Sequence, residues 1–206
     1  MGKHFAGENE KARFETFIDA ILAIIITILV LEFRVPENAY SSDDEIKSFI
    51  RHMAPAVFSY VISFATIVSL WINHHDLCRL IKTVDIRFVI LNFVFILFLS
   101  SLPFTTALAG RNHESSYAVA LVATNYFLMN ISFASMWGYV VTKKIIPEEA
   151  ARSKAFKRNS IIAIIGSILL LISIPLAYVS TYISFALFIV VLILHISKEF
   201  FYDVDQ

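Results

Sequence analysis

The amino-acid sequence predicts an all-α integral membrane bundle of six transmembrane helices with no soluble domain. Composition is the first observation, since 58% of the 206 residues are hydrophobic and 17% are charged. Soluble domains are about 45–50% apolar and about 25% charged. The second observation is a series of apolar runs that approach or exceed the roughly 18–20 residues that cross a bilayer as a helix. These runs leave almost no chain over, so residues 1–206 are expected to form a single six-span membrane domain.

The first predicted span, about 14–33, starts with charged residues and then becomes apolar. Arg13, Glu15 and Asp19 come first, and Thr27 is the only polar residue in the apolar run that follows. No small-residue cleavage site follows this run, and charged residues stand on both sides of it. The pattern predicts a retained helix and not a cleaved signal peptide.

Five more apolar runs complete the predicted bundle. The six spans are about 14–33, 48–73, 86–108, 116–141, 158–178 and 180–201. Most prolines lie at or near span ends, where a missing backbone N–H costs least. They are Pro36, Pro103, Pro147 and Pro175, and Pro55 falls in the first turns of the second span. A short turn near 178–181 separates the last two spans.

The placement of lysine and arginine predicts the orientation of the bundle. The N-terminal segment, the second and fourth connections and the C-terminus together carry 13 of these residues, and the opposite side carries 4. Cytoplasmic segments are the ones enriched in Lys and Arg, so both termini are expected in the cytoplasm, with the plasma membrane as the location. The formal net charge of zero argues against a nucleic-acid partner, and no soluble partner is implied.

Polar residues at the inner ends of the first three spans are the first candidate site, because such groups are costly in lipid. The second span ends in the sequence SLWINHH, and the third starts beside Arg87 and Asn92. We expect a hydrogen-bonded network of residues from the first two spans: Arg13, Asp19, Trp71, Asn73, His74 and His75. It would act either as a structural clamp that orients the helices or in proton sensing or catalysis.

Metal binding and enzymatic chemistry find little support in the sequence. Adjacent His74 and His75 point about 100° apart on a helix and do not converge on one ion. The single cysteine, Cys78, excludes an intrachain disulfide and most thiolate metal sites. No G-x-S-x-G, H-E-x-x-H or phosphate-binding glycine loop is present. We therefore expect no cofactor, no metal and no enzyme activity.

A second candidate site lies in the apolar half of the first span. Ile24, Ile28 and Leu31 are spaced i, i+4, i+7, so they share one helical stripe, and Thr27 borders it. Any apolar helix offers such a stripe for lipid contact or packing. Spacing alone therefore leaves its role open.

The residues around this stripe resemble the transmembrane protein 175 family of cation channels, known from endolysosomes and bacteria. The family pattern is an Arg, then Phe-Ser-Asp, then Ala-Ile and a Thr. The matching residues here are Arg13, Phe17, Ile18, Asp19, Ala23, Ile24 and Thr27, with Ile18 in place of the serine. The segments SFATIVSLWINHH (63–75) and LNFVFILFLSSLPFTT (91–106) also look like the family.

The resemblance implies a potassium-permeable leak channel whose pore is lined by the first spans of several copies. A chain with one six-span repeat would form a homotetramer in the bilayer. The aliphatic constriction and its threonine would be Ile24, Thr27, Ile28 and Leu31, with K⁺ as the permeating ion. No T-V-G-Y-G filter is present, so aliphatic rings that exclude water would have to supply gating and a modest preference for K⁺ over Na⁺.

Two other hypotheses stay open at this point. A proton-coupled transporter of ions or small solutes could use the polar layer, and would show saturable flux that depends on His74 or His75. A membrane-embedded enzyme or haem protein is the third, and a visible absorbance spectrum would test it.

Overall fold

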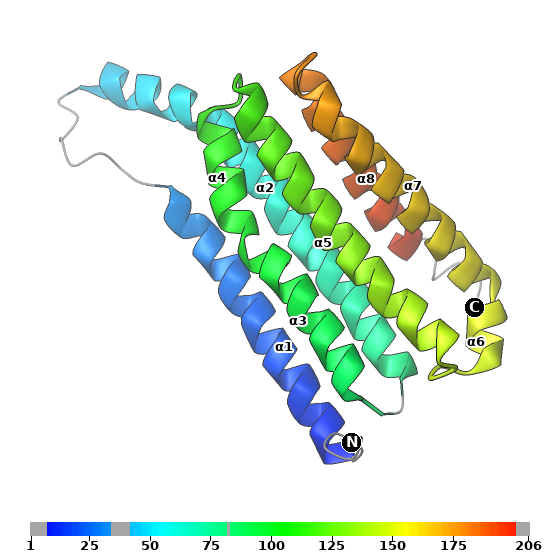
Figure 1. The fold of residues 1–206 in the computed structure, drawn as a ribbon. Helices are drawn as coiled ribbons and strands as arrows, with labels where there is room; N and C mark the ends of the chain where they lie inside the picture. The colour runs from blue at the N-terminus through cyan, green and yellow to red at the C-terminus, as the bar shows by residue number, and fades with distance from the viewer. Residues whose placement is uncertain (1–7, 34–41, 82, 201–206) are drawn as a thin grey trace.

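The computed structural model describes residues 8–33, 42–81 and 83–200, which form helices joined by short connections and contain no strand. Figure 1 shows the arrangement. The helices are α1 (Glu8–Leu29) with the 3₁₀ turn η1 (Val30–Glu32), α2 (Asp43–Leu80), α3 (Ile86–Ser100), α4 (Leu102–Arg111), α5 (Ser116–Thr142), α6 (Glu148–Arg152), α7 (Lys154–Leu176) and α8 (Thr181–Phe200). Residue 201 of the last predicted span, and Lys3, Arg34 and Lys82 of the orientation argument, lie outside the described residues.

Six long helical segments match the six predicted spans, counting α3 and α4 together, so the predicted fold class is confirmed. Four are long and apolar enough to cross a membrane: α2, the α3–α4 segment Ile86–Arg111, α5, and Phe156–Leu176 of α7. The first span carries charged residues in its N-terminal half, and the described apolar part of α8, Thr181–Ile196, is shorter. The start of α1 and the end of α8 lie toward the same end of the bundle (Figure 1).

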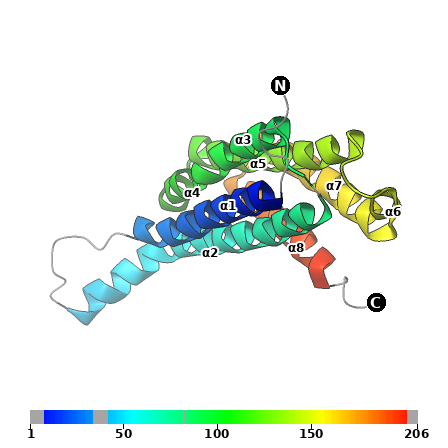
Figure 2. The ribbon, with the colours of Figure 1, turned by 90° about the horizontal axis from the view of Figure 1, so that it is seen from below.

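Helix α2 is longer at both ends than the predicted span 48–73. It begins at Asp43 because Ser42 forms a capping box with Glu45, in which each side chain accepts a bond from the other residue's backbone N–H. At the other end it continues to Leu80, where Leu77 and Cys78 are buried against the bundle. Pro55 therefore lies in the interior of α2 and not in its first turns. The residues before it extend beyond the bundle (Figures 1 and 2).

The predicted span 86–108 corresponds to the segment Ile86–Arg111, in which the chain forms α3 and α4 with a break at Ser101. Pro103 stands at the start of α4, where its missing N–H needs no partner. The polar groups at the break are bonded within the bundle. Ser101 Oγ lies 2.8 Å from the Phe98 carbonyl oxygen and 2.9 Å from Asn125 Oδ1 on α5.

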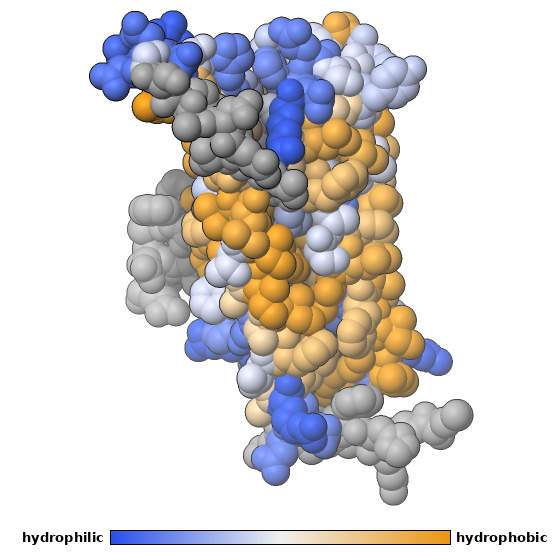
Figure 3. All heavy atoms as spheres, turned by 90° about the vertical axis from the view of Figure 1, so that its left-hand side faces the viewer, coloured by the Kyte–Doolittle hydropathy of each residue, from blue (hydrophilic) through white to orange (hydrophobic). Residues whose placement is uncertain are grey.

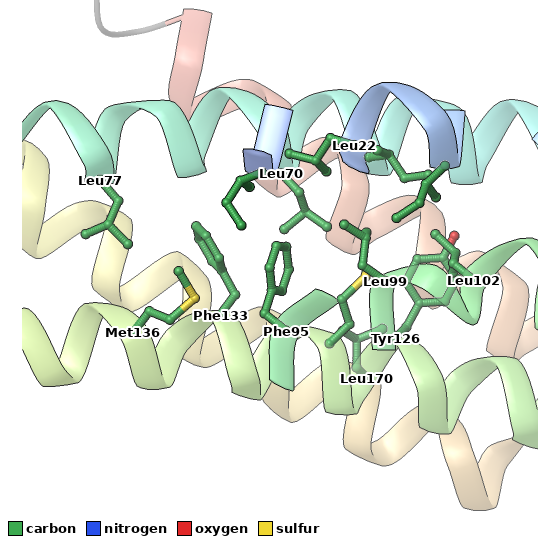
Figure 4. Close-up of a cluster of buried hydrophobic side chains, with 14 of the residues drawn as sticks. Leu22, Leu70, Leu77, Phe95, Leu99, Leu102, Tyr126, Phe133, Met136 and Leu170 are labelled. Atoms are coloured by element: carbon green, nitrogen blue, oxygen red, sulfur yellow. The ribbon is translucent and has the colours of Figure 1, made fainter. Parts of the chain in front are cut away.

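Large buried side chains fill the centre of the bundle, where α5 packs against α3, α4 and α7 and α2 packs against α4. Phe95 and Leu99 of α3, Met136 of α5 and Leu22 of α1 are each at most 1% exposed (Figure 4). Helices α2 and α4 come very close at Gly110, where an added Cβ would lie 2.9 Å from the Cα of Ala56. Small residues of this kind allow membrane helices to approach each other closely.

Candidate functional site

Helix α1 presents two faces of opposite character. One face packs into the bundle through residues spaced at helical intervals: Phe14, Ile18, Leu22, Ile25 and Leu29, all at most 8% exposed. The other face carries the predicted pore residues. Ile24 is 56% exposed, Ile28 42%, and Leu31, which lies in η1, 69%. The chain itself therefore leaves this stripe uncovered along α1.

Thr27 is also exposed on this face, and its hydroxyl is oriented by the helix. Thr27 Oγ1 donates its hydrogen to the Ile24 carbonyl oxygen at 2.9 Å. A hydroxyl whose proton is used in this way keeps its oxygen lone pairs available. Thr27 can therefore offer an oxygen, and not a hydrogen, to a cation beside α1.

The exposed face of α1 belongs to an apolar belt on the surface of the molecule. Figure 3 shows hydrophobic residues across the middle of this side, with hydrophilic residues above and below. Such a belt is the pattern expected where a protein meets lipid or another apolar helix.

Ile18 occupies the position where the family pattern has serine, and it is fully buried, at 0% exposure. Asp19 next to it points the other way and is exposed. The isoleucine therefore adds to the packing of α1 on the bundle. The hydrogen bond that Asp19 forms, described next, does not involve residue 18.

Two of the predicted polar residues, Asp19 and Trp71, join α1 to α2. Trp71 Nε1 donates to Asp19 Oδ1 at 2.9 Å. The ring of His75, one turn along α2, stacks on the Trp71 ring with 5.9 Å between centroids. This group of three is exposed in the single chain, beside the uncovered stripe of α1.

His74 lies in a separate, buried group on the other side of α2. Its Nε2 is 2.8 Å from Asn92 Oδ1, its Nδ1 is 3.7 Å from Cys78 Sγ, and its ring stacks on Phe95. His74 is 2% exposed, whereas His75 is exposed. The two histidines thus have different surroundings and different partners.

The single network expected at this level is therefore corrected for Arg13. Its side chain is 81% exposed and pairs along its own helix with Glu10, at 3.8 Å, rather than with Asp19 or α2. Glu10 lies one turn before Arg13 on the same helix, so the two side chains can pair within α1. Asn73 is buried and donates to the Ser69 carbonyl oxygen of its own helix at 2.6 Å.

Sequence reasoning missed a third polar group, formed by Ser63 of α2, Thr106 of α4 and Tyr126 of α5. Ser63 Oγ lies 2.9 Å from Thr106 Oγ1 and 3.0 Å from Tyr126 Oη. The available signal was the spacing of polar residues along α2: Ser59, Ser63, Thr66, Ser69 and Asn73.

Among the described residues, there is no group of three or more His, Cys, Asp or Glu side chains that could hold a metal ion.

Comparisons with known proteins agree on one family. The family model described as endosomal/lysosomal potassium channel TMEM175 matches residues 13–103. A protein named potassium channel from Chamaesiphon minutus is 30% identical over 149 residues, covering 70% of this chain and 73% of that protein. One from Streptomyces collinus is 26% identical over 182 residues, covering 86% and 87%.

A solved structure shares the fold. The crystal structure of a lysosomal potassium-selective channel TMEM175 homologue from Chamaesiphon minutus matches with a TM-score of 0.77 and 23% identity. The match covers 93% of this chain and 99% of that one. Similarity therefore extends over the whole helical bundle, including the α5–α8 half that the family model does not match.

Proposed function

The chain belongs to the TMEM175 family, and on that premise we propose that it forms a potassium channel whose ions pass along the exposed face of α1. It is a multi-pass membrane protein, and its relatives from two bacteria are named potassium channels. The observation that carries the proposal is the uncovered stripe of Ile24, Thr27, Ile28 and Leu31 opposite the buried face of α1.

A pore along this face requires several copies of the chain. The stripe lies on the surface of the single chain, and α1 lies at the edge of the bundle (Figure 1). Cyclic association would place equivalent α1 helices around one axis and cover their exposed stripes. We propose a homotetramer in the plasma membrane, with both termini in the cytoplasm and each subunit a single six-span domain.

In this arrangement the residues of α1 would have distinct roles. Rings of Ile24, Ile28 and Leu31 would form apolar constrictions that water leaves easily, which is one way to gate a pore. Thr27 oxygens would replace part of the hydration shell of a passing ion. K⁺ sheds water at lower cost than Na⁺, and few fixed dipoles enforce the choice, so the selectivity would be modest.

The Asp19–Trp71–His75 group would hold α1 at the correct rotation. An oriented tryptophan N–H on a carboxylate is a charge-assisted hydrogen bond, and such bonds are stronger than neutral ones. A rotation of α1 about its axis by one residue, about 100°, would replace the apolar stripe with its neighbours. The group therefore supports the pore face without lining it.

Planar bilayer recording of purified protein tests the proposal, with Ile24→Ala as the decisive variant. The shorter side chain should widen the narrowest ring and raise the single-channel K⁺ conductance or change the K⁺ to Na⁺ preference. Ile168→Ala is the matched control, because Ile168 is 51% exposed on α7, and α7 packs mainly against α5 and α8. Its currents should equal those of the wild type.

Three results would count against the proposal or a part of it. If the wild-type protein carries no K⁺ current, the proposed channel function is refuted. If the wild-type protein shows a saturable ion or solute flux and His74→Gln abolishes it, a transporter is favoured. Currents equally unaffected by both alanine variants would keep the channel but remove Ile24 from the pore.

A further inference from the structure

The stretch that joins α5 to α7 and opens α7 is strongly basic, and the pore proposed above uses none of it. Residues 143–158 carry six basic and two acidic side chains, a net charge of +4: Lys143, Lys144, Arg152, Lys154, Lys157 and Arg158 against Glu148 and Glu149. Arg152 pairs with Glu148 at 3.3 Å. The four lysines are exposed and form no ion pair within the part of the chain that the structure describes. We call Lys143, Lys144, Lys154 and Lys157 the lysine surface.

The lysine surface comes from two adjacent helices. Its first two lysines directly follow α5, and the second, Lys144, has a left-handed backbone with a φ of 53° that turns the chain back. Ile146, 4% exposed, holds the connection against the bundle. Phe156 lies between the two lysines of α7 and contacts Trp137 of α5, with 5.5 Å between ring centroids. The lysines that follow α5 and those that open α7 therefore lie at the same end of one packed helix pair.

The lysines of α7 share a helix face with exposed apolar residues. Lys154 and Lys157 precede Ile161 by seven and four residues, and Ile164 and Ile165 follow it by three and four, so all five lie on one face. The isoleucines are 57%, 60% and 43% exposed. Helix α7 packs mainly on α5 and α8, on the side of the bundle away from α1 (Figure 1). One outward face of α7 thus carries positive charge at its start and an apolar surface directly beyond it.

The depth of the lysine surface matches that of lipid headgroups. Trp137 is half-buried near the end of α5, and tryptophan is enriched at the boundary between membrane and water. Lys143 lies six residues further along, about 9 Å at 1.5 Å per residue. The lysines of α7 lie in a first turn that holds no acidic residue, where positive charge opposes the helix dipole. They do not stabilise α7 themselves, and an anion beside them would remove this cost.

We propose that the lysine surface binds the headgroup of an anionic phospholipid, with the phosphate between Lys154 and Lys157 and an acyl chain along Ile161, Ile164 and Ile165. Charge complementarity selects an anionic headgroup over a zwitterionic one, since basic clusters beside membrane helices attract anionic lipids. The apolar face beyond the lysines selects a lipid over a soluble phosphate. The site lies at the end of the bundle proposed as cytoplasmic, and binding there does not depend on the pore.

Quenching of tryptophan fluorescence by brominated lipids tests this site in a bilayer. The full-length protein with Trp71→Phe keeps Trp137, which contacts Phe156 at the lysine surface, as its only tryptophan. It is reconstituted in phosphatidylcholine vesicles that contain equal small fractions of brominated phosphatidylglycerol or brominated phosphatidylcholine. The binding constant derived from the quenching should be at least about tenfold higher for phosphatidylglycerol.

Paired variants in the same background assign this preference to the lysine surface. Lys154→Gln with Lys157→Gln should lower the preference at least about tenfold, and Lys154→Arg with Lys157→Arg should keep it, because the charge is kept. Lys47→Gln with Arg51→Gln is the matched control, since it removes two positive charges from the opposite end of the bundle (Figure 1). Its preference should equal that of the parent protein.

A second pair covers the case in which the first does not fold. Lys143→Gln with Lys144→Gln removes the same charge from the α5 side of the lysine surface and should lower the preference at least about threefold. Inorganic phosphate, added in place of chloride at equal ionic strength, should not relieve the quenching by brominated phosphatidylglycerol.

Four results would overturn the proposal. Equal quenching by the two brominated lipids in the parent protein would show that no anionic lipid is selected. A preference that survives both lysine-to-glutamine pairs would place the anionic lipid elsewhere. A loss of equal size in the control pair would reduce the effect to net charge. Relief of quenching by inorganic phosphate would assign the surface to a soluble anion.

Discussion

Replacing Gly110 by alanine tests the close approach of α4 to α2. The added methyl would lie 2.9 Å from the Cα of Ala56 and 3.3 Å from both Cβ and Oγ of Ser59. The first contact is with backbone, which cannot rotate away as a side chain can. Overpacking of this kind costs about 1–3 kcal/mol, and glycine to alanine in a helix returns about 0.5–1 kcal/mol. The net loss in the free energy of unfolding should be roughly 0–2.5 kcal/mol.

Gly138→Ala is the matched control, because nothing lies within 4 Å of its added Cβ. It keeps only the helical gain and should stabilise by about 0.5–1 kcal/mol. For a chain of this size, 1 kcal/mol shifts Tm by roughly 2–4 °C. In thermal unfolding in detergent, the Tm of Gly110→Ala should be lower than that of the wild type by up to about 10 °C, and the Tm of Gly138→Ala should be higher by about 1–4 °C. A Gly110→Ala protein at least as stable as Gly138→Ala would refute the close packing of these helices.

Two further predictions concern the core and the link between α1 and α2. Leu99→Ala, at 0% exposure, should lower the free energy of unfolding by about 2–5 kcal/mol. Leu97→Ala, at 63% exposure on the same helix, should change it by less than about 0.5 kcal/mol, and equal losses in thermal unfolding would contradict the assigned core. Trp71→Phe keeps a ring but removes the N–H that donates to Asp19, which should cost about 1 kcal/mol. In a double-mutant cycle with Asp19→Ala, which removes the acceptor, a coupling energy of zero would show that the bond contributes nothing.

The number and order of the membrane helices could be predicted from the sequence, because hydropathy reports directly on contact with lipid. Helix ends could not, since a helix continues wherever its backbone bonds are made. Residues 74–80 are too polar to extend an apolar run, yet they stay helical as Leu77 and Cys78 pack inward. The Ser42–Glu45 capping box was visible in the sequence and marks the true start of α2. Pro103 was visible too, but an unbroken hydropathy signal hid the break beside it.

The candidate site, too, could be predicted from the sequence only in part. Ile24, Ile28 and Leu31 lie one or two helical turns apart, so periodicity alone was enough to group them. The structure leaves this stripe exposed. The contact between Asp19 and Trp71 joins residues 52 positions apart, and their expected place at the same ends of the first two spans indicated that they belong to one group. Ser63, Thr106 and Tyr126 are 43 and 63 positions apart in their two contacts. Single polar residues in apolar spans are too common for sequence spacing to select these three.

The two faces of α1 impose two separate evolutionary constraints on one short segment. Substitutions at Ile18, Leu22 or Ile25 must be compensated within the same gene, by changes on the helices that these residues contact. In the proposed assembly, a substitution at Ile24 or Ile28 would change every copy at once, and the new side chains would face one another around the axis. In an alignment of relatives, the first set should therefore covary with positions elsewhere in the chain. Positions of the second set should vary with little correlated change at positions outside α1.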